Sequence, residues 1–249
     1  SQPCLVGSEM CIRDSSHAFL RQSSHCFIGG TNLLASNLNR WGLWRIDRKD
    51  SFHLAVPETV LLGTGWNDYQ NTANRATRDI PSRALSRRLT HSARDGYTRQ
   101  HLATIGLKAL NTSCPTTWAL TPEHCARIPR ARAAEAVFTL SAWRPDAAAD
   151  RAFVDALRRH YKRVWFFPQM QDDWAYFRGF GWDDIGMVPP STPGYTRFLD
   201  ENDVDVVGTR LHGGIRAIQR GRRALILAID NRTAEIGRDT GLPVADRKD

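Results

Sequence analysis

The chain has 249 residues, of which 41% are hydrophobic and 24% are charged, values ordinary for a globular protein. This composition excludes a disordered chain, a collagen and a disulfide-stapled scaffold. The longest apolar run, residues 224–229, is far too short to cross a bilayer, so we expect no integral membrane segment.

The net charge is +8, from 34 basic and 26 acidic residues. All but four of the basic residues are arginines, whose guanidinium groups suit bidentate contacts with carboxylates and phosphates. A genomic base composition that favours arginine is the alternative explanation for this excess. Because the arginines are scattered, without a basic stripe or interleaved aromatic residues, we expect no nucleic-acid partner.

The five cysteines form neither a C-x-x-C pair nor a Cys/His cluster at zinc spacing. An odd number of scattered cysteines in a chain of this length indicates free thiols in a reducing compartment. We therefore expect a cytoplasmic protein without a metal site.

Changes in composition divide the chain into four parts. Residues 1–15 lack periodicity and also lack the basic start and apolar core of a signal peptide, so we expect a non-native or disordered leader. Residues 16–120 are predicted to form a partial N-terminal domain and residues 134–249 a C-terminal domain. The two prolines near residues 121–133 indicate a linker there. The abrupt ends suggest a fragment of a longer protein.

In the first half, short apolar runs alternate with glycines. Residues 26–30 are predicted to form a strand that ends in two glycines, followed by a helix that starts in residues 31–34. Residues 59–65 repeat the strand-and-glycine pattern, and residues 89–93 and 109–112 are further strands. Asp95 is suited to start a helix that Gly106 stops.

The second half continues this alternation. Strands are expected at residues 136–140, 164–167, 203–207 and 224–229, and helices at residues 150–162 and 212–220. Strands that alternate with helices are typical of parallel sheets. We therefore predict an α/β fold with two Rossmann-like domains, in which ligands bind at the carboxyl ends of the strands.

The most informative segment is residues 206–215, where a buried strand meets a helix. Arg210 and His212 follow the strand, and the start of the helix offers free N–H groups and the positive end of its dipole. Gly213 and Gly214 allow a ligand to approach the backbone. The pattern predicts an anion site beside a titratable group. Alternatively, Arg210 caps a carbonyl and His212 replaces an N-cap residue.

Two further arginines follow strand ends. Arg232 comes after the next buried strand, so it is expected at the same sheet edge as His212. The alternative is an Asx turn at Asp230 with a solvated Arg232. Arg94 follows the strand at residues 89–93 and is expected to point toward a cleft between the domains. The alternative is an ion pair of Arg94 with Asp95.

These motifs resemble the polysaccharide pyruvyltransferase family. The resemblance rests on GTRLHGGIRAIQRG at residues 208–221, ILAIDNR at residues 226–232 and S-x-R-D at residues 92–95. NTSCPTTW at residues 111–118 and FIGGTNLL at residues 27–34 add to it, so that it spans roughly residues 26–244. The R-L-H element with a basic residue 20 positions later is the most specific part, whereas the glycine turns are common.

The resemblance implies a two-domain fold similar to GT-B glycosyltransferases, here with an incomplete N-terminal domain. It also implies transfer of the pyruvyl unit of phosphoenolpyruvate to two hydroxyls of a saccharide, giving a cyclic ketal on a cell-surface polysaccharide or its precursor. The partners are then this donor and a saccharide or lipid-linked glycan acceptor, and no cofactor is needed.

By the same resemblance, His212 and Arg210 match the R-L-H element and Arg94 matches the arginine of S-x-R-D. His212 is expected to be the catalytic general acid. Arg94, Arg210, Arg232 and Gly213 are expected to bind substrate. Arg232 stands where the family often has lysine, which favours a charge clamp over proton transfer because arginine keeps its proton.

Two alternatives stay open at this point. The same helix N-terminus would suit the diphosphate of a nucleotide sugar, as in a GT-B glycosyltransferase. A non-catalytic protein that binds carbohydrates or anions is the other alternative.

Overall fold

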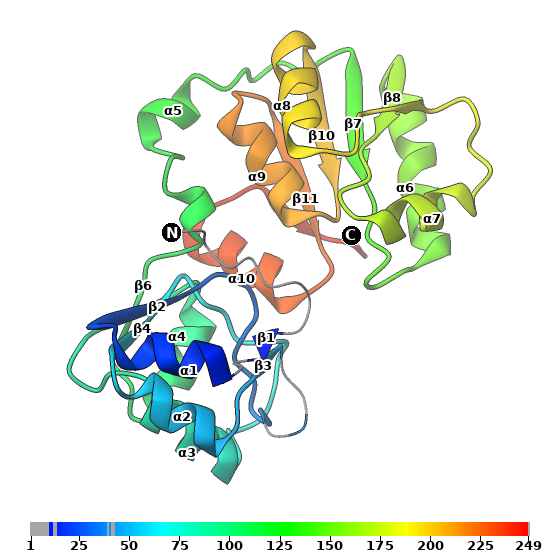
Figure 1. Ribbon diagram of the computed structural model, residues 1–249. Helices are drawn as coiled ribbons and strands as arrows, with labels where there is room; N and C mark the ends of the chain where they lie inside the picture. Colours follow the sequence, from blue (N-terminus) through cyan, green and yellow to red (C-terminus); the bar gives the residue numbers. More distant parts are fainter. Residues whose placement is uncertain (1–9, 12–13, 39, 41–42, 249) are drawn as a thin grey trace. The chain divides into compact units, whose positions relative to one another are not determined.

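The computed structural model describes residues 10–11, 14–38, 40 and 43–248 (Figure 1). The chain divides into two compact units. Unit 1 comprises Ser1–Pro115 with Arg238–Thr240, and unit 2 comprises Thr116–Gly237 with Gly241–Asp249. The linker predicted at residues 121–133 lies in unit 2 and contains helix α5 (Pro122–Ala126), where His124 Nε2 lies 2.7 Å from the carbonyl oxygen of Ile218.

Unit 1 contains short parallel strand pairs and four helices among the described residues. Its strands are β1 (Met10–Cys11), β2 (His25–Gly29), β3 (Trp44–Arg45), β4 (Glu58–Leu62), β5 (His91–Ala93) and β6 (Ala109–Asn111). Its helices are α1 (Asp14–Arg21), α2 (Arg48–Leu54), α3 (Arg75–Ala84) and α4 (Gly96–Thr104). Of the predicted leader, residues 10–11 and 14–15 lie in β1 and α1, while residues 1–9 and 12–13 lie outside the described residues.

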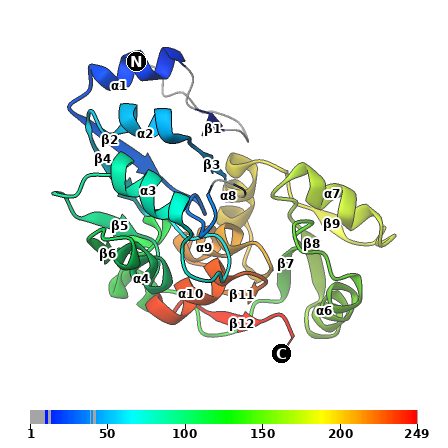
Figure 2. The same cartoon turned by 90° about the horizontal axis from the view of Figure 1, so that it is seen from below.

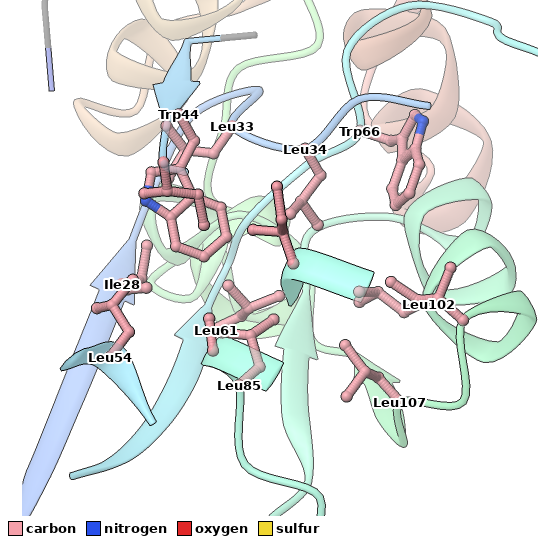
Figure 3. Close-up of a cluster of buried hydrophobic side chains, with 14 of the residues drawn as sticks. Ile28, Leu33, Leu34, Trp44, Leu54, Leu61, Trp66, Leu85, Leu102 and Leu107 are labelled. Carbon is pink, nitrogen blue, oxygen red and sulfur yellow. The ribbon is translucent and has the colours of Figure 1, made fainter. Parts of the chain in front are cut away.

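The strands of unit 1 pair in parallel: β1 with β3, β2 with β4, and β5 with β6. A parallel bridge between Thr64 and Ala93 joins the segment after β4 to β5. Figure 3 shows the apolar side chains that pack around β2 and β4, including Leu61 and Trp66, and both of these are fully buried. Burial of this cluster is the main favourable contribution to the folding of unit 1.

The helix predicted to start in residues 31–34 is wrong. Gly30 and Thr31 turn the backbone with φ values of 73° and 31°. The following backbone groups then pair with the segment after β4: Leu34 N–H donates to Gly65 O at 3.2 Å, and Gly65 N–H donates to Thr31 O at 3.0 Å. Pairing with a distant segment thus replaces the local hydrogen bonds that a helix would make.

Helix α4 begins and ends where the sequence indicates. The Asp95 side chain caps its start by accepting a hydrogen bond from Thr98 N–H at 2.7 Å. Leu102 and Ile105 are buried, and Gly106 follows with a φ of 77°. Cys26, on β2, is a free thiol as predicted.

Unit 2 is built on one six-stranded parallel sheet. Its strands are β7 (Glu135–Thr139), β8 (Arg163–Phe166), β9 (Gly186–Met187), β10 (Val204–Gly208), β11 (Ala224–Ala228) and β12 (Val244–Asp246). Besides α5, its helices are α6 (Ala147–His160), α7 (Gln171–Arg178), α8 (Thr192–Glu201), α9 (Leu211–Gln219) and α10 (Asn231–Thr240), which begins in unit 2, and a 3-10 turn, η1, spans Pro115–Thr117.

The strand order of this sheet is β9-β8-β7-β10-β11-β12. Counted from β7, this is the order 3-2-1-4-5-6 of the doubly wound Rossmann fold. The chain therefore leaves β7 in one direction along the sheet and returns to start β10 on its other side, as Figures 1 and 2 show. The α/β class and the parallel sheets predicted from the sequence are confirmed.

Both faces of the sheet in unit 2 are covered. Phe138, Phe166 and Phe177 belong to a buried cluster with residues of α6 and α7. Val137 and Val206 belong to a second cluster with residues of α8 and α9. Successive residues of β7 thus face different clusters, which explains why the strand reads as an unbroken apolar run. No helix in the described part of the chain has the length and apolar character needed to cross a bilayer.

Candidate functional site at the sheet edge of unit 2

The candidate site lies where β7 and β10 end. These neighbouring strands form the point at which the strand order reverses, and doubly wound folds bind ligands at the carboxyl ends of such strands. Thr139, the last residue of β7, accepts hydrogen bonds from Thr209 N–H at its carbonyl, at 3.0 Å, and from Arg210 N–H at Oγ1, at 3.2 Å. The loop after β10 is therefore fixed against the end of β7.

Gly208 allows this close approach of the two strands. A Cβ at this position would lie 2.2 Å from the carbonyl oxygen of Thr139, so only glycine fits. The φ of Gly208, 154°, also suits glycine. The glycine at the start of the family-like segment thus positions Arg210.

Helix α9 starts directly after Arg210, which is its N-cap residue. Its side chain does not cap the helix and turns instead to Asp173. His212 lies in the first turn of α9 and is exposed. The N-cap alternative for His212 is therefore wrong, and so is the carbonyl-capping alternative for Arg210. The first-turn amides and the dipole of α9 favour an anion at this end.

Asp173 is the residue that sequence reasoning missed. It is fully buried and forms a bidentate pair with Arg210, whose Nε lies 2.9 Å from Oδ2 and whose second terminal nitrogen contacts Oδ1. The same carboxylate accepts N–H bonds from Ala142, at 3.1 Å, and Met170, at 3.0 Å. The side chain of Arg210 is 17% exposed, so Asp173 fixes the orientation of a guanidinium that still reaches solvent.

Gly213 and Gly214 differ in what surrounds them. A Cβ on Gly214 would lie 2.4 Å from Cγ1 of Ile226, so this glycine is needed for α9 to pack on β11. A Cβ on Gly213 would make ordinary contacts, 3.4 Å from Thr139 and 3.5 Å from Gln169. Packing within the protein therefore does not require glycine at position 213.

The carbonyl of Gly213 accepts a hydrogen bond from the hydroxyl of Tyr195, at 3.0 Å. Tyr195, on α8, is almost fully buried, and this burial raises the pKa of its hydroxyl far above the usual range. The hydroxyl therefore stays protonated and holds the first turn of α9 against α8.

Arg232 lies one strand further along the same edge. Asp230 caps α10 by accepting from Thr233 N–H at 2.9 Å, and its other oxygen lies 3.0 Å from a terminal nitrogen of Arg232. The Asx turn that was the alternative interpretation of Asp230 is thus present, as the cap of helix α10. Because β10 and β11 are neighbours, α9 and α10 both begin at this edge, and the Arg232 side chain is 25% exposed there.

Arg94 belongs to unit 1, where its environment is well packed. The residue is 2% exposed, and its guanidinium contacts Asn32 and lies 3.3 Å from Asp95, so the ion pair of the alternative reading is present. A Cβ at position 65 would lie 2.0 Å from the same guanidinium, so glycine is needed at this position to leave room for Arg94. A common site for Arg94 and the arginines of unit 2 stays a prediction.

Within the described ranges, no three His, Cys, Asp or Glu side chains gather as metal ligands would. The charged groups of the candidate site are arginines with buried carboxylate partners, Arg210 with Asp173 and Arg232 with Asp230. This arrangement is suited to hold a small anion next to the imidazole of His212.

Comparison with known protein families identifies the family of this chain. The family model described as "Polysaccharide pyruvyl transferase" matches residues 6–231. The matched range includes Arg210, His212 and Gly213 of the candidate site. It ends one residue before Arg232. No curated protein and no solved structure matches the chain.

Proposed function

This chain belongs to the polysaccharide pyruvyl transferase family and is thus a transferase, and from that premise we propose that its donor is phosphoenolpyruvate. The product is a pyruvate ketal on a saccharide of a cell-surface polysaccharide or its precursor. The observation that carries the proposal is the pair of Arg210 with buried Asp173 at the start of α9, one residue before the first helical turn that carries exposed His212.

The donor carries a phosphate and a carboxylate, and the sheet edge has groups for both. Arg210 is the primary partner, because its guanidinium is held in one orientation and remains partly exposed. Arg232 provides a second cation in the first turn of α10, after the neighbouring strand. The amides at the start of α9 add N–H donors, and Gly213 places no side chain beside them.

The reaction starts with a proton transfer from the imidazolium of His212 to the methylene carbon of the donor. The C2 atom then becomes electrophilic, and one saccharide hydroxyl attacks it and gives its proton to the neutral imidazole of His212. A second hydroxyl attacks C2 as the bond between C2 and the phosphate oxygen breaks. Phosphate leaves with the bonding electrons, takes up the proton of the second hydroxyl and is stabilised by the arginines. A positioned general acid accelerates such a step by about 10²–10⁴-fold.

The remaining expectations belong to the same proposal. Arg94 contributes a third guanidinium from unit 1, which corresponds to the N-terminal domain in a GT-B-like pair of domains. The reaction takes place in the cytoplasm and uses a saccharide or lipid-linked glycan as acceptor. Apart from the donor, the proposed steps require no cofactor.

The test is saccharide-dependent release of phosphate from phosphoenolpyruvate across a panel of glycans. We expect release by the wild-type chain and a loss of at least about 10²-fold in the His212→Ala variant, because the general acid is removed. Since His212 is exposed, its replacement should leave the unfolding midpoint unchanged. Undiminished release by His212→Ala would contradict the assignment, and binding of a nucleotide sugar instead of phosphoenolpyruvate would replace it.

A further inference from the structure

Exposed apolar side chains are carried by the two segments whose backbone N–H groups bind Asp173, the carboxylate partner of Arg210. Trp143, in the loop after β7, is 71% exposed, and Met170, at the start of α7, is also exposed. Both segments are tied to the carboxylate that holds Arg210: Ala142, the neighbour of Trp143, donates its N–H to Asp173 Oδ1, and Met170 donates its own N–H to Oδ2. Asp173 Oδ1 thus contacts both Arg210 and Ala142, and Trp143 is the residue after Ala142.

The loop that carries Trp143 is held at several points. Trp143 N–H donates to Ser141 Oγ at 3.3 Å, and Arg144 donates to the carbonyl of Ile229 at 3.2 Å. The carbonyl of Arg144 in turn accepts from Arg247 at 2.6 Å. A large side chain on a fixed backbone binds a ligand at a small entropic cost. Trp174, by contrast, stacks on Phe177 at 5.7 Å between ring centroids and so packs within its own helix.

We propose that Trp143 is the platform on which one sugar ring of the acceptor stacks. This inference rests on the proposed function, since the reacting hydroxyls of the acceptor must reach the donor that Arg210 holds. A sugar ring has an apolar face of C–H groups, which packs on an indole, while its hydroxyls point outward from the ring edge. The arginines supply affinity for the anionic donor, so a neutral sugar needs an apolar surface beside them.

A saccharide is the occupant that the family and the exposed indole favour for this surface. The chain belongs to a family of polysaccharide pyruvyl transferases, and the exposed indole belongs to the residue after Ala142, whose N–H binds the carboxylate partner of Arg210. Trp143 therefore determines affinity for the acceptor and leaves affinity for phosphoenolpyruvate unchanged.

The experiment measures KM for each substrate by phosphate release in Trp143→Ala, Trp143→Phe and Phe19→Ala. The probes are methyl glycosides and disaccharides of glucose, galactose and mannose, with phosphoenolpyruvate as donor. Phe19, on α1, is 73% exposed and serves as the matched control. We expect Trp143→Ala to raise the acceptor KM about tenfold or more, with the donor KM within about twofold of wild type. The acceptor KM of Trp143→Phe should lie between those of the wild type and Trp143→Ala, because phenylalanine keeps an aromatic face.

An unchanged acceptor KM in Trp143→Ala, or an equal rise in both KM values, overturns the inference. A second arm keeps its failure separate from failure of the proposed function. If the wild-type chain releases no phosphate with any probe, the proposed function fails, and binding of the same saccharides is then measured by calorimetry. Binding that is lost in Trp143→Ala but kept in Phe19→Ala supports the platform, whereas equal binding, or no binding to the wild type, overturns it.

Discussion

Asp173 connects three segments through one buried carboxylate: the loop after β7, the start of α7 and the start of α9. Its role at the residue scale is to fix the guanidinium of Arg210. A buried charge pair adds little to net stability but becomes costly when one partner is removed. A substitution of Asp173 should therefore affect the site, although Asp173 itself is not a proposed contact of the donor.

Asp173→Asn should both destabilise unit 2 and weaken donor binding. The amide cannot accept all the hydrogen bonds that the carboxylate accepts, and Arg210 loses its counter-charge. We expect a loss of about 3 kcal/mol in the free energy of unfolding and a rise in the KM for phosphoenolpyruvate. Denaturant unfolding and phosphate-release kinetics measure the two effects. Asp172→Asn, at the exposed neighbour, is the control, and equal behaviour of the two variants would argue against this role of Asp173.

Gly213 and Gly214 offer a matched pair of substitutions. Gly214→Ala should lower the free energy of unfolding by about 1–3 kcal/mol, because its methyl group meets Ile226. Gly213→Ala should leave stability unchanged or raise it by up to about 1 kcal/mol, since alanine favours the helix. Its methyl group should nevertheless raise the KM for the donor. Thermal unfolding and kinetics of both variants check this, and a Gly213→Ala variant with wild-type KM would remove this glycine from the site.

The sequence predicts part of the site because chemistry-bearing residues follow strands that can be recognised. Arg210, His212 and Arg232 follow β10 and β11, and the structure places all three at one sheet edge. Asp173 was missed because its function depends on a contact across 37 residues, which spacing does not show. The only local signal was an acidic residue in the first turn after a buried strand, a place where helices commonly carry a capping carboxylate.

At the scale of elements, strand β5 carries a buried histidine that links it to β4. His91 Nδ1 accepts from Leu61 N–H at 3.2 Å, and Nε2 lies 2.9 Å from the carbonyl of Ser86, to which it donates. Burial lowers the pKa of His91, and the carbonyl of Ser86 opposes this in part. The neutral imidazole of His91 therefore accepts the hydrogen bond from Leu61 N–H that a backbone carbonyl of the neighbouring strand would otherwise accept.

This histidine makes the stability of unit 1 depend on pH. Its folded-state pKa lies below the unfolded value of about 6.5, so its contribution is present above that pH and is lost as the pH falls. The slope reaches at most about 1.4 kcal/mol per pH unit for one proton. The pKa of His101 is also lowered, chiefly by burial, so it adds to the same trend.

We therefore expect the urea midpoint of unfolding to be lower at pH 5.5 than at pH 7.5 in the wild-type chain. His91→Gln should unfold at lower urea at both pH values but with a smaller difference between them, because glutamine at this position does not titrate. Fluorescence-monitored unfolding gives the four midpoints. If the variant keeps the full difference, the pH dependence has another source.

Element boundaries follow from the sequence where local chemistry decides them. Asp95 and Gly106 mark the two ends of α4, and the capping bond of Asp95 confirms the predicted start. The helix expected from residues 31–34 does not form, because Leu34 pairs with the distant Trp66 segment instead. Tertiary pairing of this kind overrides a local preference and cannot be inferred from a short apolar run.

At the scale of the whole molecule, the alternation of strands and helices is enough to predict the α/β class. It does not give the strand order, because strands buried on both faces show no alternation that would distinguish a central strand from its neighbours. The reversal between β7 and β10 appears only in the structure. It is this reversal that brings Thr139 and Arg210 together and gives the candidate site its place.

The alternation of strands and helices does not determine whether Arg94 shares a site with Arg210 and Arg232. Its guanidinium is buried against Asn32 and Asp95 within unit 1, whereas Arg210 and Arg232 belong to unit 2. Their convergence on one donor is part of the proposed function. The contacts of Arg210 and His212 with the donor require only the edge of the sheet in unit 2.

A crystal structure of the chain with phosphoenolpyruvate bound would locate the donor site. We expect the donor at the carboxyl ends of β7 and β10, with one of its anionic groups on Arg210 and the first-turn amides of α9, and with its methylene carbon facing His212. A donor bound elsewhere, such as at the amino ends of these strands or in a site formed by unit 1 alone, would rule out this placement.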